Sequence, residues 1–151
     1  MIYHLKNVSN DYLLLLQYLQ EIDNDFEISL SQKVNLEEYV SKLLQNGYVY
    51  TVIDENKRNI LACVGFYCND MNTHIAYLSL LSTRMQARGK GYAKLLVNTM
   101  VECCKKRGMY KIFCDSVNPI AVKLYKSCGF IQYKIESCER LTKTFLKLDL
   151  L

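Results

Sequence analysis

Two short stretches of the sequence combine residue types that could do chemistry. The first, QARGKGYAKLLV at residues 86–97, places two glycines and two cations directly before an apolar run at helical spacing. Unpaired N–H groups and the positive dipole end at a helix start suit phosphate oxygens, and glycine lets a phosphate approach the backbone. Arg84, Arg88 and Lys90 add positive charge. Alone, the stretch is compatible with an anion site and with a basic structural turn.

Two common phosphate-loop patterns are missing from this stretch. No Gly-Lys-Ser/Thr follows a four-residue spacer, as a P-loop requires, and the third glycine of the dinucleotide fingerprint is absent. The second stretch, NPIAVKLYKSCGF at residues 118–130, starts a helix with Asn118 as N-cap and proline at the first helical position. That helix is expected to end at Gly129.

Together the two stretches resemble the GCN5-related N-acetyltransferase superfamily. Its members carry an R/Q-x-x-G-x-G/A loop, followed later by an N-x-x-A-x-x-L-Y-x-x-x-G-F helix. The loop here reads Arg88-Gly89-Lys90-Gly91-Tyr92-Ala93, and the helix carries Asn118, Ala121, Leu124, Tyr125, Gly129 and Phe130. A register starting at Gln86 also satisfies the loop, but the Arg88 register puts the small Ala93 one turn into the helix. The resemblance is strong over residues 48–135 and topological elsewhere.

The resemblance implies a mixed α/β fold with a central, mostly antiparallel, splayed sheet and helices on both faces. It implies acetyl-CoA as cosubstrate and no metal. The loop residues Arg88, Gly89, Lys90, Gly91, Tyr92 and Ala93 would hold its pyrophosphate. The backbone of Leu81, Ser82 and Thr83 would pair with its amide arm, and Asn118, also readable as a simple N-cap, would bond the pantetheine. Tyr125 would give a proton to the departing thiolate, a role that competes with that of a core aromatic residue.

The resemblance leaves the proton acceptor open. Many relatives carry a glutamate in the strand before the loop, but HIAYLSLLST at residues 74–83 has no carboxylate. His74, Asp115 and the acidic residues of 21–27 are weak candidates, and a water chain serves equally well. The expected function is acetyl transfer to a primary amine, preferably of a small molecule, by direct attack in a ternary complex. The alternative is a module that binds or senses coenzyme A without turnover.

Eleven elements are expected to position these stretches within one domain, residues 1–151. Strands are predicted at 2–8, 48–53, 60–68, 74–82, 111–115, 130–135 and 144–150, and helices at 9–20, 35–47, 90–107 and 118–129. The first helix would bury Tyr12, Leu13, Leu16 and Leu19. Asn35 and Glu38 would form a capping box for the second helix, and residues 21–33 would form a loop or a short irregular turn.

The composition argues against nucleic-acid-binding, membrane-spanning and secreted proteins. The 151 residues are 50% hydrophobic and 23% charged with a net charge of +4, which is too mild to indicate nucleic-acid binding. No apolar run approaches the roughly 20 residues of a membrane span, and no signal-peptide layout is present. Seven cysteines without a metal spacing fit buried thiols in a reducing cytoplasm. The last strand could pair across a homodimer.

Overall fold

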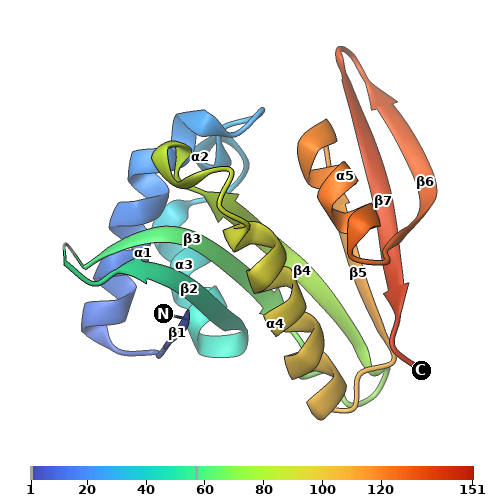
Figure 1. Cartoon of the computed structure of the whole chain (residues 1–151), viewed down its shortest axis with the longest axis horizontal. Coiled ribbons are helices and arrows are strands. Elements are labelled where there is room, and N and C mark those ends of the chain that lie inside the picture. The colour runs from blue at the N-terminus through green and yellow to red at the C-terminus, as the bar shows by residue number, and fades with distance from the viewer. Residues whose placement is uncertain (1, 57) are drawn as a thin grey trace.

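The computed structural model describes residues 2–56 and 58–151 and contains a single seven-stranded sheet. The strands are β1 Ile2–Leu5, β2 Tyr48–Asp54, β3 Asn59–Tyr67, β4 Ile75–Thr83, β5 Lys111–Ser116, β6 Ile131–Cys138 and β7 Leu141–Asp149. The helices are α1 Ser9–Ile22, α2 Leu30–Lys33, α3 Leu36–Asn46, α4 Tyr92–Lys106 and α5 Pro119–Ser127, with short 3₁₀ turns η1 at Asp23–Asp25 and η2 at Met85–Ala87. Figure 1 shows their arrangement.

The sheet order is β1-β2-β3-β4-β5-β7-β6. All neighbouring strands are antiparallel except β4 and β5, which are parallel. Helices cover both faces and build two apolar clusters. One cluster joins α4 and α5 to residues such as Phe66, Leu78 and Ile112, and the other joins α1 and α3 to residues such as Val49 and Leu80. The predicted mixed α/β class, with a mostly antiparallel sheet between helices, is therefore confirmed.

Local signals in the sequence account for several element ends. The Asn35 side chain accepts a hydrogen bond from the Glu38 amide at 3.0 Å, so the predicted helix cap is confirmed. Asn118 likewise caps α5 by accepting from the Ile120 amide at 2.9 Å. The strands predicted at 48–53 and 60–68 are confirmed as β2 and β3, which pair as an antiparallel hairpin with a register from Tyr48–Phe66 to Asp54–Asn59.

Three predictions at the N-terminal end are wrong. The first strand ends at Leu5 rather than Val8, and Val8 occupies the N-cap position of α1 without a side-chain cap. Leu13 is 60% exposed, whereas Leu15, Leu19 and Ile22 are buried. The expected loop at residues 21–33 contains the end of α1, η1 and α2. There the Asp23 carboxylate accepts hydrogen bonds from the amide and hydroxyl of Ser31, so a polar sequence folds through a contact between residues eight apart.

Candidate active site

The parallel strands β4 and β5 separate after three residue pairs. The ladder runs from Ile75–Lys111 to Tyr77–Phe113, and no further pair joins the two strands in the described chain. β4 nevertheless continues to Thr83 and β5 to Ser116. We call the separated segments, residues 78–83 and 114–116, the fork; its open end lies where β4 leads toward α4 (Figure 1). The fork leaves one edge of β4 without a strand partner, which is how a sheet pairs with an extended ligand.

A β-bulge in β4 accompanies the fork. Gly65 of β3 pairs with Leu80 and Phe66 pairs with Leu78, so Ser79 has no opposing residue. A bulge bends its strand and increases the local twist. The Ser79 hydroxyl is 2.7 Å from the Tyr39 hydroxyl of α3, which fixes the bulged residue against the helix face. The bulge thus helps to turn the end of β4 away from β5.

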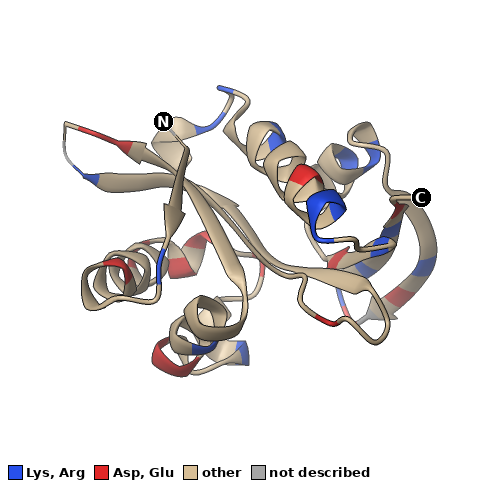
Figure 2. Ribbon diagram, turned by 90° about the horizontal axis from the view of Figure 1, so that it is seen from below, with Lys and Arg blue, Asp and Glu red and all other residues tan. Residues whose placement is uncertain are grey.

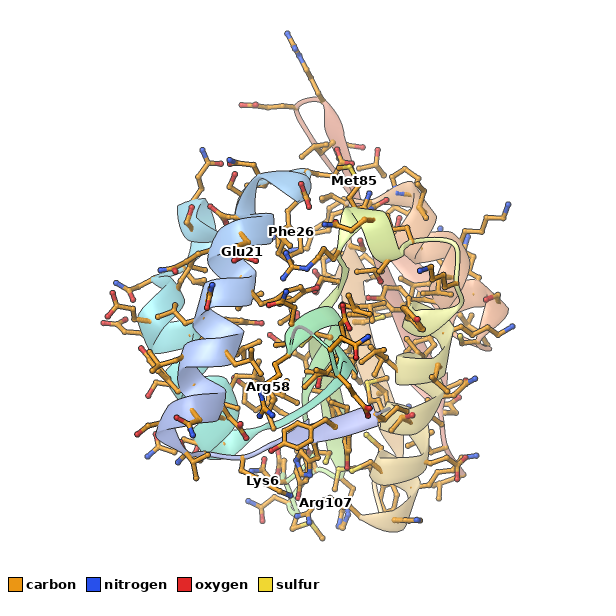
Figure 3. The ribbon with its side chains drawn as sticks, turned by 60° about the vertical axis from the view of Figure 1, so that its left-hand side comes forward. Lys6, Glu21, Phe26, Arg58, Met85 and Arg107 are labelled. Atoms are coloured by element: carbon orange, nitrogen blue, oxygen red, sulfur yellow. The ribbon has the colours of Figure 1, made fainter. Side chains whose placement is uncertain are left out.

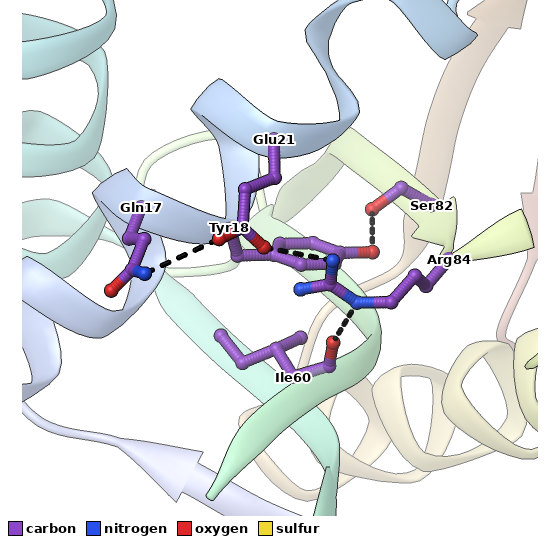
Figure 4. Close-up of polar contacts among 6 residues, drawn as sticks. All are labelled: Gln17, Tyr18, Glu21, Ile60, Ser82 and Arg84. Atoms are coloured by element: carbon purple, nitrogen blue, oxygen red, sulfur yellow. Dashed lines mark hydrogen bonds and ion pairs between the residues drawn. The ribbon is translucent and has the colours of Figure 1, made fainter. Parts of the chain in front are cut away.

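The end of β4 is fastened to α1 on one side (Figure 4). The Tyr18 hydroxyl lies 2.9 Å from Ser82 Oγ, and the Arg84 guanidinium stacks over the Tyr18 ring at 5.1 Å. Arg84 also donates to Glu21 at 2.8 Å and to the Ile60 carbonyl at 3.0 Å. Because the Ser82 side chain is bonded to Tyr18, Ser82 offers the fork chiefly its backbone. The pairing of Leu81, Ser82 and Thr83 with an amide arm stays a prediction.

The predicted anion loop connects this strand end to α4. Gly89 and Gly91 both have φ of +80°, a left-handed conformation that only glycine adopts readily, and a Cβ at either position would meet nothing within 4 Å. The first helical bond runs from the Leu95 amide to the Gly91 carbonyl at 3.1 Å. The amides of Tyr92, Ala93 and Lys94 therefore have no partner in the helix ladder and are available to an anion.

The cations before α4 serve two different purposes. Arg88 and Lys90 are exposed, and Arg88 Nε donates to the Thr83 carbonyl at 3.3 Å, which places the loop beside the end of β4. The Arg84 side chain is 16% exposed and pairs with Glu21, so its charge is used in packing rather than left for a phosphate. Figure 2 shows cations on the loop leading into α4 and along α4. The turn η2 directly precedes this loop, and its Met85 lies at the same end of the molecule as Glu21 and Phe26. Arg107 lies at the opposite end (Figure 3).

The helix α5 lies across the fork from this loop and carries the other predicted site residues. Asn118 is partly buried and its side-chain oxygen is occupied by the cap, which leaves its amide NH₂ for other partners. Tyr125 is 3% exposed and its ring lies 5.6 Å from that of Phe130. Burial, followed by nearby Cys114 and Asp115, raises the pKa of Tyr125 well above its usual value. The phenol is therefore neutral and holds its proton at physiological pH.

The Tyr125 hydroxyl is available to a ligand. No hydrogen bond from the described residues holds it, yet among them no fully buried side-chain oxygen lacks a partner. The hydroxyl oxygen therefore keeps some contact with solvent. A neutral, protonated and unengaged phenol suits a group that donates a proton. The assignment of Tyr125 as the proton donor stays a prediction.

The residues considered as proton acceptors lie in different parts of the structure, and Asp25 and Glu27 are exposed. His74 precedes β4, stacks on Tyr110 at 4.5 Å and bonds the Gly108 carbonyl at the closed end of the sheet. Glu21 pairs with Arg84 and Asp23 with Ser31. Asp115 instead lies on the fork, where it accepts a hydrogen bond from the Tyr77 hydroxyl at 3.0 Å. Tyr77 belongs to no sequence motif, and only the register between β4 and β5 brings it to the fork.

Comparisons with known proteins were consistent with one another. Residues 15–130 match the family model described as the acetyltransferase (GNAT) family, whereas no curated protein matches the sequence. A GCN5-related N-acetyltransferase from Kribbella flavida has a TM-score of 0.80 at 19% identity, covering 99% of this chain and 98% of that one. A ribosomal-protein-alanine N-acetyltransferase from Brucella melitensis has 0.76 at 18% identity, covering 99% of both chains.

A spermidine N-acetyltransferase from Vibrio cholerae, described as dodecameric, is also similar, with a TM-score of 0.73 at 19% identity, covering 99% of this chain and 93% of that chain. At these identities the likeness shows the fold alone. Within residues 2–56 and 58–151, no helix is long and apolar enough to cross a membrane. The family model covers most of the chain, and the fork, the glycine loop and α5 occur in the order that the motifs predict. The chain belongs to the acetyltransferase (GNAT) family.

Proposed function

We propose that this protein transfers an acetyl group from acetyl-CoA to a primary amine, preferably of a small molecule, by direct attack in a ternary complex. One observation carries the proposal. The unpaired edge of β4 runs from a loop of exposed amides to the closed end of the fork, and α5, on the other side of the fork, carries a neutral tyrosine hydroxyl. An elongated cosubstrate with an anionic end and a reactive end fits such a path.

The residues divide the work along this path. The loop amides from Gly89 to Ala93, with Arg88 and Lys90, would hold the pyrophosphate. The backbone of Leu81–Thr83 would pair with the amide arm, and the Asn118 amide group would bond the pantetheine. Gly89 and Gly91 support this assignment because the space beside both is open.

The chemistry then needs one proton donor at the sulfur. When the amine nitrogen attacks the thioester carbon, the C–S bond breaks and a thiolate leaves. Tyr125 would give its proton to that sulfur, which eases departure because a free thiol has a pKa of about 8.5. Its raised pKa does not prevent this role, since proton donation requires the neutral phenol at the start of the step.

Two measurements test the proposal. Acetyl-CoA should raise the melting temperature in a concentration-dependent way. At a concentration of 100 times Kd, the bound ligand should increase the free energy of unfolding by about 2.7 kcal/mol. Released thiol should then appear with at least one amine from a panel of spermidine, 2-phenylethylamine, glucosamine and a peptide that begins with alanine. Spermidine and the peptide represent the acceptor classes in the names of two similar structures. A melting temperature indifferent to acetyl-CoA would refute the proposal.

A non-catalytic coenzyme A-binding module is the second candidate. The stretch 74–83 lacks a carboxylate, so the strand glutamate that many relatives carry is absent. This candidate predicts the melting shift with acetyl-CoA but no thiol release with any amine. A cytoplasmic location and a homodimer through the closing strands are further proposals; light scattering of the purified protein tests the dimer.

A further inference from the structure

The Tyr77–Asp115 contact spans the closed end of the fork. Tyr77 forms the last parallel pair with Phe113, and Asp115 lies two residues further along β5, on the same face of the sheet as Phe113. The Tyr77 hydroxyl donates to Asp115 Oδ2 at 3.0 Å. A carboxylate is therefore held where β4 and β5 separate, and the charge of Asp115 is felt at the Tyr125 hydroxyl on α5.

A primary ammonium already lies against this carboxylate. Lys143 Nζ of β7 is 3.6 Å from Asp115 Oδ1 and 5.3 Å from the centroid of the Phe145 ring. The ammonium thus has a carboxylate and an aromatic face as neighbours, an arrangement that favours cations. The Asp115 side chain is 23% exposed and that of Lys143 is 43% exposed, so an incoming molecule can reach the pair.

The surrounding surface is aromatic and partly exposed, and Lys147 Nζ lies 5.9 Å from the centroid of the Tyr133 ring. Tyr133 contacts Phe113 edge-on at 5.7 Å and lies 6.3 Å from Phe145, and Tyr133 is 47% exposed. Lys134, the other lysine over Phe145, is paired with Glu136 at 2.9 Å. The groups that contact Asp115 among the described residues are therefore Tyr77 from β4 and Lys143 from β7, and the charge of Asp115 also acts on Tyr125 of α5.

We propose that Asp115 binds the ammonium group of the acceptor, which replaces the Lys143 ammonium, and that the acceptor is a cationic primary amine with an apolar body lying over Phe113, Tyr133 and Phe145. The assignment rests on the proposed acetyl transfer. A half-exposed ion pair contributes little to stability, so Lys143 yields its place at low cost. Tyr77 holds the carboxylate and is a positioning residue.

Protons and bonds balance in the resulting reaction. The bound ammonium loses one proton to water, and the freed lone pair forms the C–N bond to the thioester carbon. The C–S bond breaks and the sulfur takes the Tyr125 proton. The amide nitrogen still carries one extra proton from the amine, and it gives this proton to the Tyr125 oxygen, which restores the neutral phenol. The products are the amide, the thiol and one proton released to solvent.

Opposite effects of two variants test the assignment. The acceptors are spermidine, 2-phenylethylamine and a peptide that begins with alanine, each titrated at saturating acetyl-CoA. Asp115→Asn should raise KM for the amine about 10-fold or more, because a charge-assisted contact is lost. Lys143→Met should lower KM by about 2- to 5-fold, because a competing cation is removed. Neither variant should change the affinity for acetyl-CoA.

Asp149→Asn is the matched control, because Asp149 Oδ1 pairs with Lys111 Nζ at 3.9 Å on the same sheet, where β5 begins and β7 ends. It should leave KM unchanged. Tyr77→Phe keeps the ring and the carboxylate and should raise KM less than Asp115→Asn does. The Lys143 side chain is partly exposed, so Lys143→Met should fold and keeps the test decisive if Asp115→Asn folds poorly.

Two results would overturn the assignment. KM unchanged in Asp115→Asn would exclude ammonium binding there, and KM raised in Lys143→Met would make the pair structural. If the wild-type protein binds acetyl-CoA but acetylates no amine of the panel, the proposed function fails, and the assignment fails with it. That outcome can be told apart from a failure of the Asp115 assignment alone, because it is seen with the wild-type protein and needs no variant.

Discussion

Gly91→Glu tests the anion loop most directly, because the chain offers a matched control in Gly108→Glu. Gly91 precedes α4 and Gly108 follows the C-cap of the same helix, with φ of +80° and +78°. A Cβ at either position would meet nothing within 4 Å. Both variants therefore carry a similar backbone cost, about 1–2 kcal/mol for a left-handed L-residue, and an identical change of charge.

Gly91→Glu should be the more stable of the two variants, but it should bind acetyl-CoA more weakly than Gly108→Glu does. A carboxylate near the start of α4 is favoured by the helix dipole, and one just past its end is disfavoured, each by about 0.3–1 kcal/mol. Gly108→Glu should therefore melt lower than Gly91→Glu, by about 2–4 °C for each kcal/mol of difference. Dipole energetics thus make the control the less stable of the two proteins.

Binding should follow the reverse order. If a diphosphate lies against the loop amides, its two negative charges at about 5 Å from the carboxylate introduced by Gly91→Glu cost about 1.7 kcal/mol even at the dielectric of water. This cost corresponds to a loss of affinity of roughly 15- to 20-fold, and more where solvent is excluded. Gly108→Glu lies at the other end of a 15-residue helix and should bind acetyl-CoA as the wild type does.

Isothermal titration calorimetry with acetyl-CoA measures the affinity of each variant, and thermal melts without ligand measure its melting temperature in the same samples. Wild-type affinity in Gly91→Glu would place the diphosphate elsewhere and refute the loop assignment. Equal losses in the two variants would also refute it, because a general effect of negative charge or of strain on α4 would then explain the result. Weaker binding in Gly91→Glu alone, despite its higher melting temperature, is the expected outcome.

Three further predictions concern the acid and the packing. Tyr125→Phe should lower kcat by about 100-fold or more in the thiol-release assay while the Kd for acetyl-CoA changes little, and an unchanged kcat would remove Tyr125 from the chemistry. Because burial raises the pKa of Tyr125, the acid stays protonated as pH rises, so kcat measured against pH should show no alkaline fall from this group below about pH 10. Gly65→Ala would put a Cβ 2.7 Å from Leu43 Cδ2; it should cost about 1–3 kcal/mol in urea unfolding, and Leu43→Val should restore part of that loss in the double variant.

The features that the sequence predicted well depend on neighbours along the chain. The caps at Asn35 and Asn118 need only an amide two or three residues away, and both are present. The prediction that Leu13 is buried failed because it depends on contacts with distant segments. Four consecutive leucines at 13–16 leave the phase of the helix undecided, and contacts with α3 and β3 choose Leu15 as the buried residue.

The motif residues of the candidate site could be predicted, and the resemblance implied the splay of the sheet, but the contacts around Asp115 could not be predicted. The glycines, Asn118 and Tyr125 stand in a motif with fixed spacing, so the sequence could point to each of them. Tyr77 and Lys143 belong to no motif. They reach Asp115 because β4 pairs with β5 and β5 pairs with β7, with Asp115 opposite Phe145. Such contacts depend on register between distant segments, which a single sequence does not fix.

The positions of Leu78 and Leu80 connect the fork with the hydrophobic core. In a regular strand, residues two apart face the same side. Here Leu78 packs with the α4 and α5 cluster, and Leu80 packs with the α1 and α3 cluster. The unpaired Ser79 between them is what allows both leucines to be buried on opposite faces. Burial of the two side chains therefore stabilises the bulge, and the bulge turns the edge of β4 outward. Core packing on both faces thus stabilises the open strand edge.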